Sequence, residues 1–341
     1  MSHAIVGNKQ KGFKWLFALV ASVALVALSA CGSNNDDNGA NASKPASESS
    51  AAANGDGYTV RIGFQKYASV NILKERGTLE AKLEEAGYKV SWTEFPGGPQ
   101  LLEAVNVGSI DFGNVGESPP IFAQAAGTPL VYLGHSPASP KAEAILVPEN
   151  SPIKNGADLK GKKVALNKGS NVHYLLVKYL EKEGLKYSDI EVVFLPPADA
   201  RAAFEGGKVD AWVIWEPFYS AAQLDTKARV LADGEGLVNN YEYYLSSRDL
   251  ATKHKAAVDI IIAQLKESDA WAKDNQPELA KTLAEKLGLK EEALVQALSH
   301  RGFGVEPITD DIVEAQQKVA DAFHELELIP DAIKVSDAVI K

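Results

Sequence analysis

Two stretches of the chain carry the same short pattern 99 positions apart. Gly108-Ser109-Ile110-Asp111 corresponds to Gly207-Lys208-Val209-Asp210, and Glu117 corresponds to Glu216. In both copies an apolar run of strand length separates the Asp from the Glu. We interpret the repeat as two similar α/β lobes, each with an acidic residue just past the end of an equivalent strand.

Strand-length apolar runs alternate with helical patterns around both copies. Such alternation is typical of βαβ units and of mostly parallel sheets. We expect strands at 60–64, 90–95, 111–115, 130–133, 164–166, 192–195 and 211–214. We expect helices at 73–86, 99–105, 119–126, 172–183, 197–205 and 217–224, and around 260–271, from 277 and at 310–326.

Two extended segments, 143–147 and 241–246, lie between these blocks. We expect them to be crossover strands that form a hinge. The chain then divides into lobe 1, with residues 58–141 plus 241–341, and lobe 2, with residues 142–240. The expected fold is α/β, with two mostly parallel sheets flanked by helices and joined by a two-strand hinge.

The N-terminus predicts export. Lys9, Lys11 and Lys14 precede an apolar run at 15–28 that is too short for a lasting membrane span, which is typical of a signal peptide over residues 1–30. Cys31, the only cysteine, follows Leu-Ser-Ala, as in a bacterial lipobox. The alternative is an ordinary signal peptide with a chance cysteine.

Residues 31–57 are mostly small and polar, and such a composition makes a flexible tether. We therefore expect an extracytoplasmic protein, in the periplasm or on the outer face of the cell membrane, held to the membrane only by lipid on Cys31. The net charge of −10 disfavours nucleic acid as a partner.

The ligand is expected where the strands end, because open α/β sheets bind ligands beyond their carboxyl ends. Polar and glycine-rich turns lie there, at 65–66, 96–100, 116–118, 168–171 and 215–217. The turn Lys168-Gly169-Ser170-Asn171 precedes a helix. Ser170 or Asn171 either caps that helix or helps its N-terminus to face an anion.

Several patterns associated with catalysis are weak or absent. The stretch 156–163 is similar to a phosphate-binding loop, but it ends in Lys163 and leads into a strand. Glu117 and Glu216 either form an acid/base pair or orient donors around the cleft. The histidines lack metal-ligand spacing, and no Gly-x-Ser-x-Gly motif occurs. We expect a binding protein without metal or cofactor.

Five stretches carry a family resemblance: "RIGFQK" (61–66), "EFPGGPQLLEAVNVGSIDFGNVGESPP" (94–120), "KAEAILVPENSPIKNGADLKGKKVALNKGSNVHYLL" (141–176), "LPPADARAAFEGGKVDAWVIWEPF" (195–218) and "GLVNNYEYYLSSRD" (236–249). They are similar to the aliphatic sulfonate-binding lipoproteins of ABC uptake transporters, within the sulfonate, taurine and nitrate group. The resemblance implies a type II periplasmic-binding-protein fold, a monomer, and an organic sulfonate delivered to a permease with its ATPase.

The resemblance and the turns together predict the site residues. Neutral donors suit a permanently ionised sulfonate, and we assign the anion to Gln65, the turn Gly98-Pro99-Gln100, Ser170 and Asn171. Trp215 is expected to pack on the alkyl part. The remaining candidates, which orient donors or shape the pocket, are Gly116, Glu117, Ser118 and Glu216.

Other functions stay open at this point. One alternative is a taurine- or nitrate-type anion-binding protein. Another is a pyrimidine-forming enzyme of thiamine synthesis on the same fold, which would need cysteine and histidine chemistry, whereas Cys31 is assigned to the anchor. The sequence predicts neither the preferred tail length nor the affinity.

Overall fold

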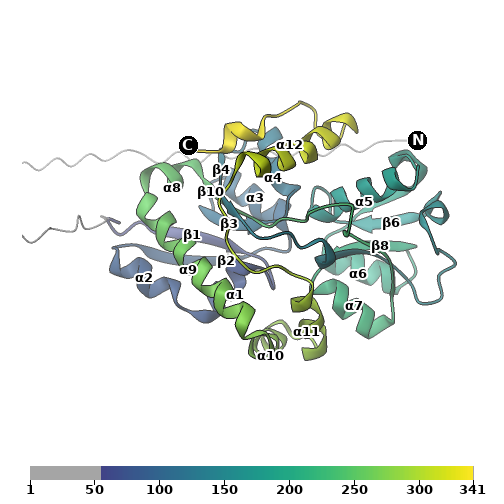
Figure 1. Ribbon diagram of the computed structural model, residues 1–341, viewed down its shortest axis with the longest axis horizontal. Helices are drawn as coiled ribbons and strands as arrows, with labels where there is room; N and C mark the ends of the chain where they lie inside the picture. The colour runs from purple at the N-terminus through teal and green to yellow at the C-terminus, as the bar shows by residue number, and fades with distance from the viewer. Residues whose placement is uncertain (1–54, 341) are drawn as a thin grey trace, which may run out of the picture. The chain divides into compact units, whose positions relative to one another are not determined.

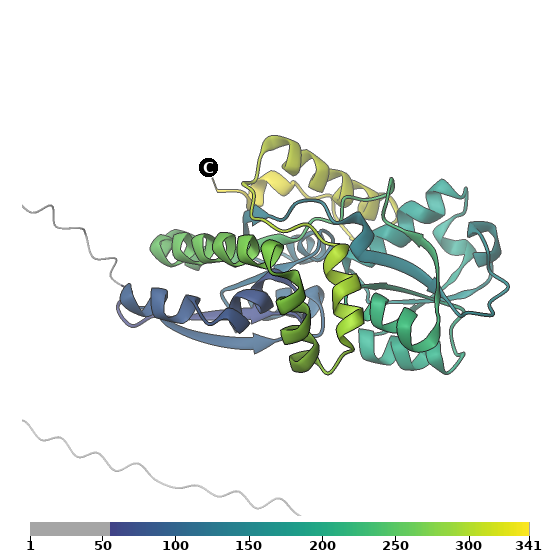
Figure 2. The same ribbon diagram turned by 60° about the horizontal axis from the view of Figure 1, so that its bottom comes forward.

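The computed structural model describes residues 55–340, so the predicted signal peptide, Cys31 and nearly all of the tether lie outside the described residues. The described chain contains two five-stranded sheets with the strand orders β2-β1-β3-β10-β4 and β7-β6-β8-β5-β9. Figures 1 and 2 show the teal strands of the second sheet grouped apart from the purple and blue strands of the first. The predicted two-sheet α/β fold is confirmed.

The first sheet is parallel except for one strand. β1 pairs in parallel with β2 and β3, whereas β10 runs antiparallel between β3 and β4. Its strands are β1 (Thr59–Phe64), β2 (Lys89–Glu94), β3 (Phe112–Val115), β4 (Leu130–His135) and β10 (Tyr243–Ser247). The helices that connect its parallel strands are α1 (Ser69–Arg76), α2 (Leu79–Glu85), α3 (Gly98–Asn106) and α4 (Pro119–Ala125).

The second sheet repeats this design. β6 pairs in parallel with β7 and β8, and β5 runs antiparallel between β8 and β9. Its strands are β5 (Glu143–Val147), β6 (Lys163–Leu166), β7 (Glu191–Phe194), β8 (Ala211–Trp215) and β9 (Arg229–Asp233), and its helices are α5 (Asn171–Lys182), α6 (Pro197–Glu205) and α7 (Phe218–Thr226). The reversed strands β5 and β10 correspond to the two segments expected to cross between lobes.

The C-terminal helices contact both halves. On α12, Phe323 packs against Phe122 of α4 and Tyr174 of α5, with ring centroids 4.9 and 5.9 Å away. α9 packs on α1 and α2, while α11 packs on α7 (Figure 1). These helices are α8 (Arg248–Lys253), α9 (Lys255–Asp274), α10 (Gln276–Leu287), α11 (Glu291–Ser299) and α12 (Asp310–Glu325). Short 3-10 turns occupy Pro140–Ala142, Gly156–Leu159, Tyr187–Asp189 and Val335–Ala338.

The sequence repeat has a structural cause. In the first sheet, Arg61 N–H donates to Asp111 Oδ2 (2.9 Å), and Asp111 N–H donates back to Arg61 C=O (2.7 Å). In the second sheet, Lys163 N–H donates to Asp210 Oδ2 and Asp210 N–H donates to Lys163 C=O, both at 2.8 Å. The repeated Asp therefore ties the start of one parallel strand to its neighbour in each sheet.

Some expected elements differ from the structure. The single helix expected at 73–86 was wrong: α1 ends at Gly77, whose φ of 63° is the left-handed conformation that terminates helices. Strand β9 was not predicted, and α8 and α11 were not distinguished as separate helices within the stretch from 249 onward, which was expected to be helical. The stretch similar to a phosphate-binding loop is a 3-10 turn capped by Asn155 that leads into strand β6, so it lacks the following helix.

Within residues 55–340, none of the helices combines the length and apolar character needed to cross a membrane.

We expect Asp111→Ala to lower the free energy of unfolding by about 3 kcal/mol and Asp210→Ala by about 1 kcal/mol. Asp111 is buried and also accepts from the Arg61 guanidinium, whereas within residues 55–340 the Asp210 side chain accepts only the backbone N–H of Lys163. Urea unfolding of both variants measures the difference. Equal losses would contradict the unequal roles of the two aspartates.

Candidate functional site

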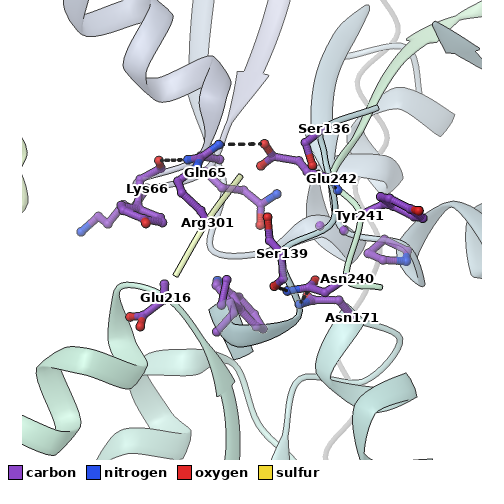
Figure 3. Close-up of a pocket in the computed structure, with 17 residues that line it drawn as sticks. Gln65, Lys66, Ser136, Ser139, Asn171, Glu216, Asn240, Tyr241, Glu242 and Arg301 are labelled. Atoms are coloured by element: carbon purple, nitrogen blue, oxygen red, sulfur yellow. Dashed lines mark hydrogen bonds and ion pairs between the residues drawn. The ribbon is translucent and has the colours of Figure 1, made fainter. Parts of the chain in front are cut away.

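A cavity of about 90 Å³ lies between the two sheets, where the chain crosses from one to the other. Figure 3 shows Gln65, Lys66 and Arg301 on one side and Asn171 and Glu216 on the other. The complete lining is Gln65, Lys66, Tyr67, Ala68, Gly98, Gly116, Pro119, Ser136, Ser139, Ala142, Asn171, Trp215, Glu216, Asn240, Tyr241, Glu242 and Arg301. Both sheets, both crossover segments and the C-terminal region therefore contribute.

Five helices begin at this cavity. Ala68 is the residue before α1, and the first residues of α3, α4 and α5 are Gly98, Pro119 and Asn171, all of which line the cavity. Glu216, two residues before α7, lines it as well. Helix N-termini carry partial positive charge, so their convergence favours a bound anion. Free N–H groups come from the starts of α1, α3 and α5, because α4 begins with Pro119 and Pro120, which have no N–H, and the Glu216 carboxylate already accepts from Ser220 N–H at the start of α7.

Glycines let the two halves meet closely beside the cavity. A Cβ atom on Gly116 would lie 2.7 Å from Asn171 Cβ, and one on Gly97 would lie 2.6 Å from Asn167 Nδ2. Both distances are shorter than ordinary contacts. The close approach of the two halves therefore depends on the absence of side chains at these two positions.

Arg301 brings a buried positive charge to the cavity. Its side chain is 6% exposed, donates to Tyr67 C=O (3.0 Å) and Ser69 Oγ (2.7 Å), and lies 3.4 Å from Glu242 Oε2. Burial raises the pKa of Glu242, and the charge of Arg301 opposes that rise. The more exposed Lys66 supplies a second cation on the same side.

Glu216 is held by its own helix and by a histidine. Ser220 donates to it from its backbone N–H (3.0 Å) and its hydroxyl (2.7 Å), and His300 Nδ1 lies 2.7 Å from Oε1. Because these contacts engage both carboxylate oxygens, Glu216 is suited to fixing the start of α7. It is poorly placed to exchange protons with Glu117, which does not line this cavity.

An amide and carboxyl network joins the two halves behind the cavity. Asn171 Nδ2 donates to the Glu143 carboxylate and to Asn240 Oδ1, and Asn240 Nδ2 donates to Ser139 C=O (2.9 Å). Burial and the charge of Glu117 raise the pKa of Glu143 well above its usual value. Burial also raises the pKa of Glu117 to about 8, although backbone N–H groups of Tyr241 and Asn240 oppose the shift.

The predicted site residues separate into two groups. The cavity is lined by Gln65, Gly98, Gly116, Asn171, Trp215 and Glu216. The residues that the structure places outside this lining are Pro99, Gln100, Glu117, Ser118 and Ser170.

The turn before α5 is largely satisfied by its own neighbours. Ser170 is buried and its hydroxyl donates to Asn167 C=O (2.7 Å), while Gly169 N–H donates to His173 Nδ1 (3.3 Å). Burial lowers the pKa of His173 to about 4, so its ring is neutral and can accept. Of the residues in the turn 168–171, Asn171 is the one that lines the cavity.

Sequence reasoning missed most of the crossover and C-terminal contributors. These are Ser136, Ser139, Asn240, Tyr241, Glu242 and Arg301. Tyr67, which directly follows the predicted turn at 65–66 and has a φ of 74°, lines the cavity as well. Arg301 lies in a loop after α11 and had no local signal.

No group of three or more His, Cys, Asp or Glu side chains within the described part of the chain is arranged to hold a metal ion.

Comparisons with known proteins agree on one family. The model of the family described as "NMT1/THI5 like" matches residues 83–280. An aliphatic sulfonates-binding protein of Escherichia coli K12 is 46% identical over 292 residues, covering 85% of this chain and 91% of the relative. The counterpart in Bacillus subtilis 168 is 34% identical, covering 82% and 85%.

A solved structure agrees with these relatives. The alkanesulfonate-binding protein SsuA from Xanthomonas axonopodis pv. citri, bound to MOPS, is 45% identical with a TM-score of 0.80. The match covers 83% of this chain and 98% of that chain.

We expect Glu117→Gln to increase the free energy of unfolding by about 4 kcal/mol at pH 8.5 and by no more than about 1 kcal/mol at pH 5. The folded-state pKa of Glu117, about 8, lies above its ordinary 4.5, so the folded protein binds more protons between these values. The stability of the unmodified protein therefore falls as the pH rises through this window.

Urea unfolding at both pH values measures this effect, with Glu103→Gln, an exposed change on α3, as the matched control. A gain of the same size at both pH values would show that Glu117 does not titrate in this window.

Proposed function

The chain belongs to the NMT1/THI5-like family and to its aliphatic sulfonate-binding proteins, and from this premise we propose that it is the extracytoplasmic solute-binding component of an ABC importer. It captures aliphatic sulfonates between its lobes and delivers them to the permease and its ATPase. The observation that carries the proposal is the cavity where five helix N-termini meet a buried arginine.

The anion is bound by donors that need no proton from the ligand. A sulfonate stays ionised at physiological pH, so it only accepts hydrogen bonds. Arg301, Lys66 and the N–H groups at the helix starts supply charge and donors on the cavity wall. Gln65 supplies a neutral amide group at the same wall. Asn171 acts there through its backbone N–H at the start of α5, because its side-chain NH₂ already donates to Glu143 and Asn240.

The organic part packs against aromatic carbon. Trp215 and Tyr67 line the cavity on opposite halves of the molecule, and Trp215 is braced by Phe218 with ring centroids 6.4 Å apart. Such a wall favours an alkyl tail over a bare inorganic anion. The five predicted residues outside the lining have no assigned contact with the ligand in this proposal.

Domain closure couples binding to delivery. The tight approach of Gly116 to Asn171 is possible only when the two halves are together. The two lobes consist of 58–141 plus 241–341 and of 142–240, and closure about the crossover segments buries the ligand. The closed monomer is the form that engages the permease.

Export and anchoring complete the proposed function. Residues 1–30 form the signal peptide, Cys31 carries the lipid, and 31–57 tether the lobes outside the cytoplasm. The relatives compared above are named as binding proteins, which supports capture rather than catalysis. A taurine- or nitrate-type ligand and a pyrimidine-forming enzyme are the alternatives that ligand and turnover measurements distinguish.

Calorimetry with alkanesulfonates of increasing length, taurine, nitrate and sulfate tests the ligand class. We expect alkanesulfonates to bind with Kd values of about 1 µM or below, and Arg301→Lys to weaken them at least ~10-fold because the forked donor is lost. Arg76→Lys, on the surface of α1, is the matched control. Binding restricted to nitrate, or turnover of any ligand, would replace the proposal.

Membrane fractionation of cells tests the anchor. We expect Cys31→Ser to move the protein from the membrane fraction to the soluble extracytoplasmic fraction and to abolish incorporation of labelled palmitate. Ser29→Ala, a small-residue change just before the cysteine, is expected to leave both unchanged. Retention of the Cys31→Ser protein in the membrane would remove the lipid anchor from the proposal.

A further inference from the structure

A second cavity, of about 420 Å³, lies on the other side of the segment that leads into β10. The side chains that matter for its chemistry are Glu117, Tyr174, Tyr241, Tyr243, Gln316 and Lys318. Within the described chain, Tyr241 is the one residue that lines both this cavity and the proposed sulfonate cavity. The volume of this second cavity falls in the range of small-molecule sites in proteins.

Three buried oxygen atoms at this cavity have no hydrogen-bond partner within residues 55–340. They are Glu117 Oε1, Tyr243 Oη and Gln316 Oε1, on residues that are 2%, 1% and 1% exposed. The amide nitrogen of Gln316 is engaged, because it donates to Glu117 C=O (2.6 Å) and to Tyr132 Oη (3.1 Å). Buried polar atoms without partners are costly, so three around one cavity indicate an occupant.

The walls between these oxygens are aromatic. The rings of Tyr241 and Tyr243 lie 6.2 Å apart at an interplanar angle of 67°, and Tyr174 of α5 adds a third ring to the lining. Aromatic faces are negative and attract cations, most effectively when several rings surround the charge. A carboxyl group beside several tyrosines therefore suits an organic cation and disfavours a sulfonate.

The ionisable groups near Glu117 also favour a positively charged ligand. Glu143 of β5 is buried close to Glu117, and the charge of Glu117 raises the pKa of Glu143. The cation in the lining, Lys318 of α12, has a side chain that is 69% exposed and lies 3.4 Å from Glu314. Among the described residues that line the cavity, there is therefore no buried cation to pair with Glu117 when its carboxyl group ionises.

We propose that this second cavity is a binding site for a small organic ammonium cation, held by the carboxylate of Glu117 and by the rings of Tyr174, Tyr241 and Tyr243. The site is distinct from the proposed sulfonate site, and its occupant has the opposite charge. The proposal does not depend on the identity of the sulfonate.

Binding of a cation here is linked to proton release. The raised pKa of Glu117, about 8, means that its carboxyl group is mostly protonated at pH 7 without a ligand. A cation favours the ionised form, so binding expels the proton and strengthens as the pH rises. The groups that modulate this titration are Glu143, Tyr174, Tyr241, Tyr243 and Lys318, which are contributed by β5, α5, the segment leading into β10, β10 itself and α12.

Calorimetric titration of the protein with tetramethylammonium chloride tests the site, in two buffers of different ionisation enthalpy at pH 7. We expect saturable binding, release of close to one proton, and affinity that rises at least ~5-fold from pH 6.5 to pH 8.5. Glu117→Gln is expected to abolish the proton release and to weaken binding at least ~10-fold at pH 8.5. Potassium chloride at the same concentration is the ionic-strength control.

Two substitutions of Tyr174 on α5 distinguish a role of its aromatic ring in cation binding from a role in packing alone. Tyr174→Phe keeps the aromatic face and is expected to change the affinity less than ~3-fold, whereas Tyr174→Leu is expected to weaken it at least ~10-fold. Tyr179→Leu, on the same helix but outside the lining, controls for stability. Absence of saturable binding, an equal response to potassium, or equal effects of the Phe and Leu variants would overturn the proposal.

A parallel titration with an alkanesulfonate keeps the two sites separate. Failure of tetramethylammonium with intact sulfonate binding would overturn the ammonium site alone. Failure of the sulfonates with intact tetramethylammonium binding would overturn the proposed function alone.

Discussion

The direction of parallel strands determines where this molecule can bind. In each sheet the parallel strands end at the same edge, and each following helix starts there, so both edges collect the positive ends of helix dipoles. The segments 136–142 and 234–242 cross between the two sheets and lead into β5 and β10, which run against their neighbours. One cavity thus receives the helix starts of both halves, and its electrostatic character follows from the backbone before any side chain is considered.

Sequence patterns predicted what the backbone determines. The alternation of elements, the two extended segments 143–147 and 241–246 and the repeated Asp all reflect local periodicity or nearest-neighbour pairing, and the structure contains them. That β5 and β10 run against their sheets was not predicted. The break at Gly77 was missed, because apolar positions on both sides kept helical spacing while the glycine adopted a left-handed conformation. Residues read from turns at strand ends, such as Gln65 and Asn171, reached the cavity lining.

The remaining residues of the site required tertiary information. Arg301 reaches Tyr67 across 234 positions of sequence, and nothing in its surrounding loop distinguishes it from a surface arginine. Ser170 had the right residue type at the right helix start, but its hydroxyl is used within its own turn. Composition and spacing identify which groups could bind, whereas the partners that already occupy those groups appear only in the folded chain.

The position of β10 also has a consequence for the order of assembly. All five strands of the second sheet come from the continuous segment 143–233, so that sheet can be completed as soon as this segment is available. The first sheet contains the earliest strands, yet β3 and β4 are neighbours only through β10, at Tyr243–Ser247. When the chain emerges N-terminus first, the sheet that starts first is therefore the one that is finished last.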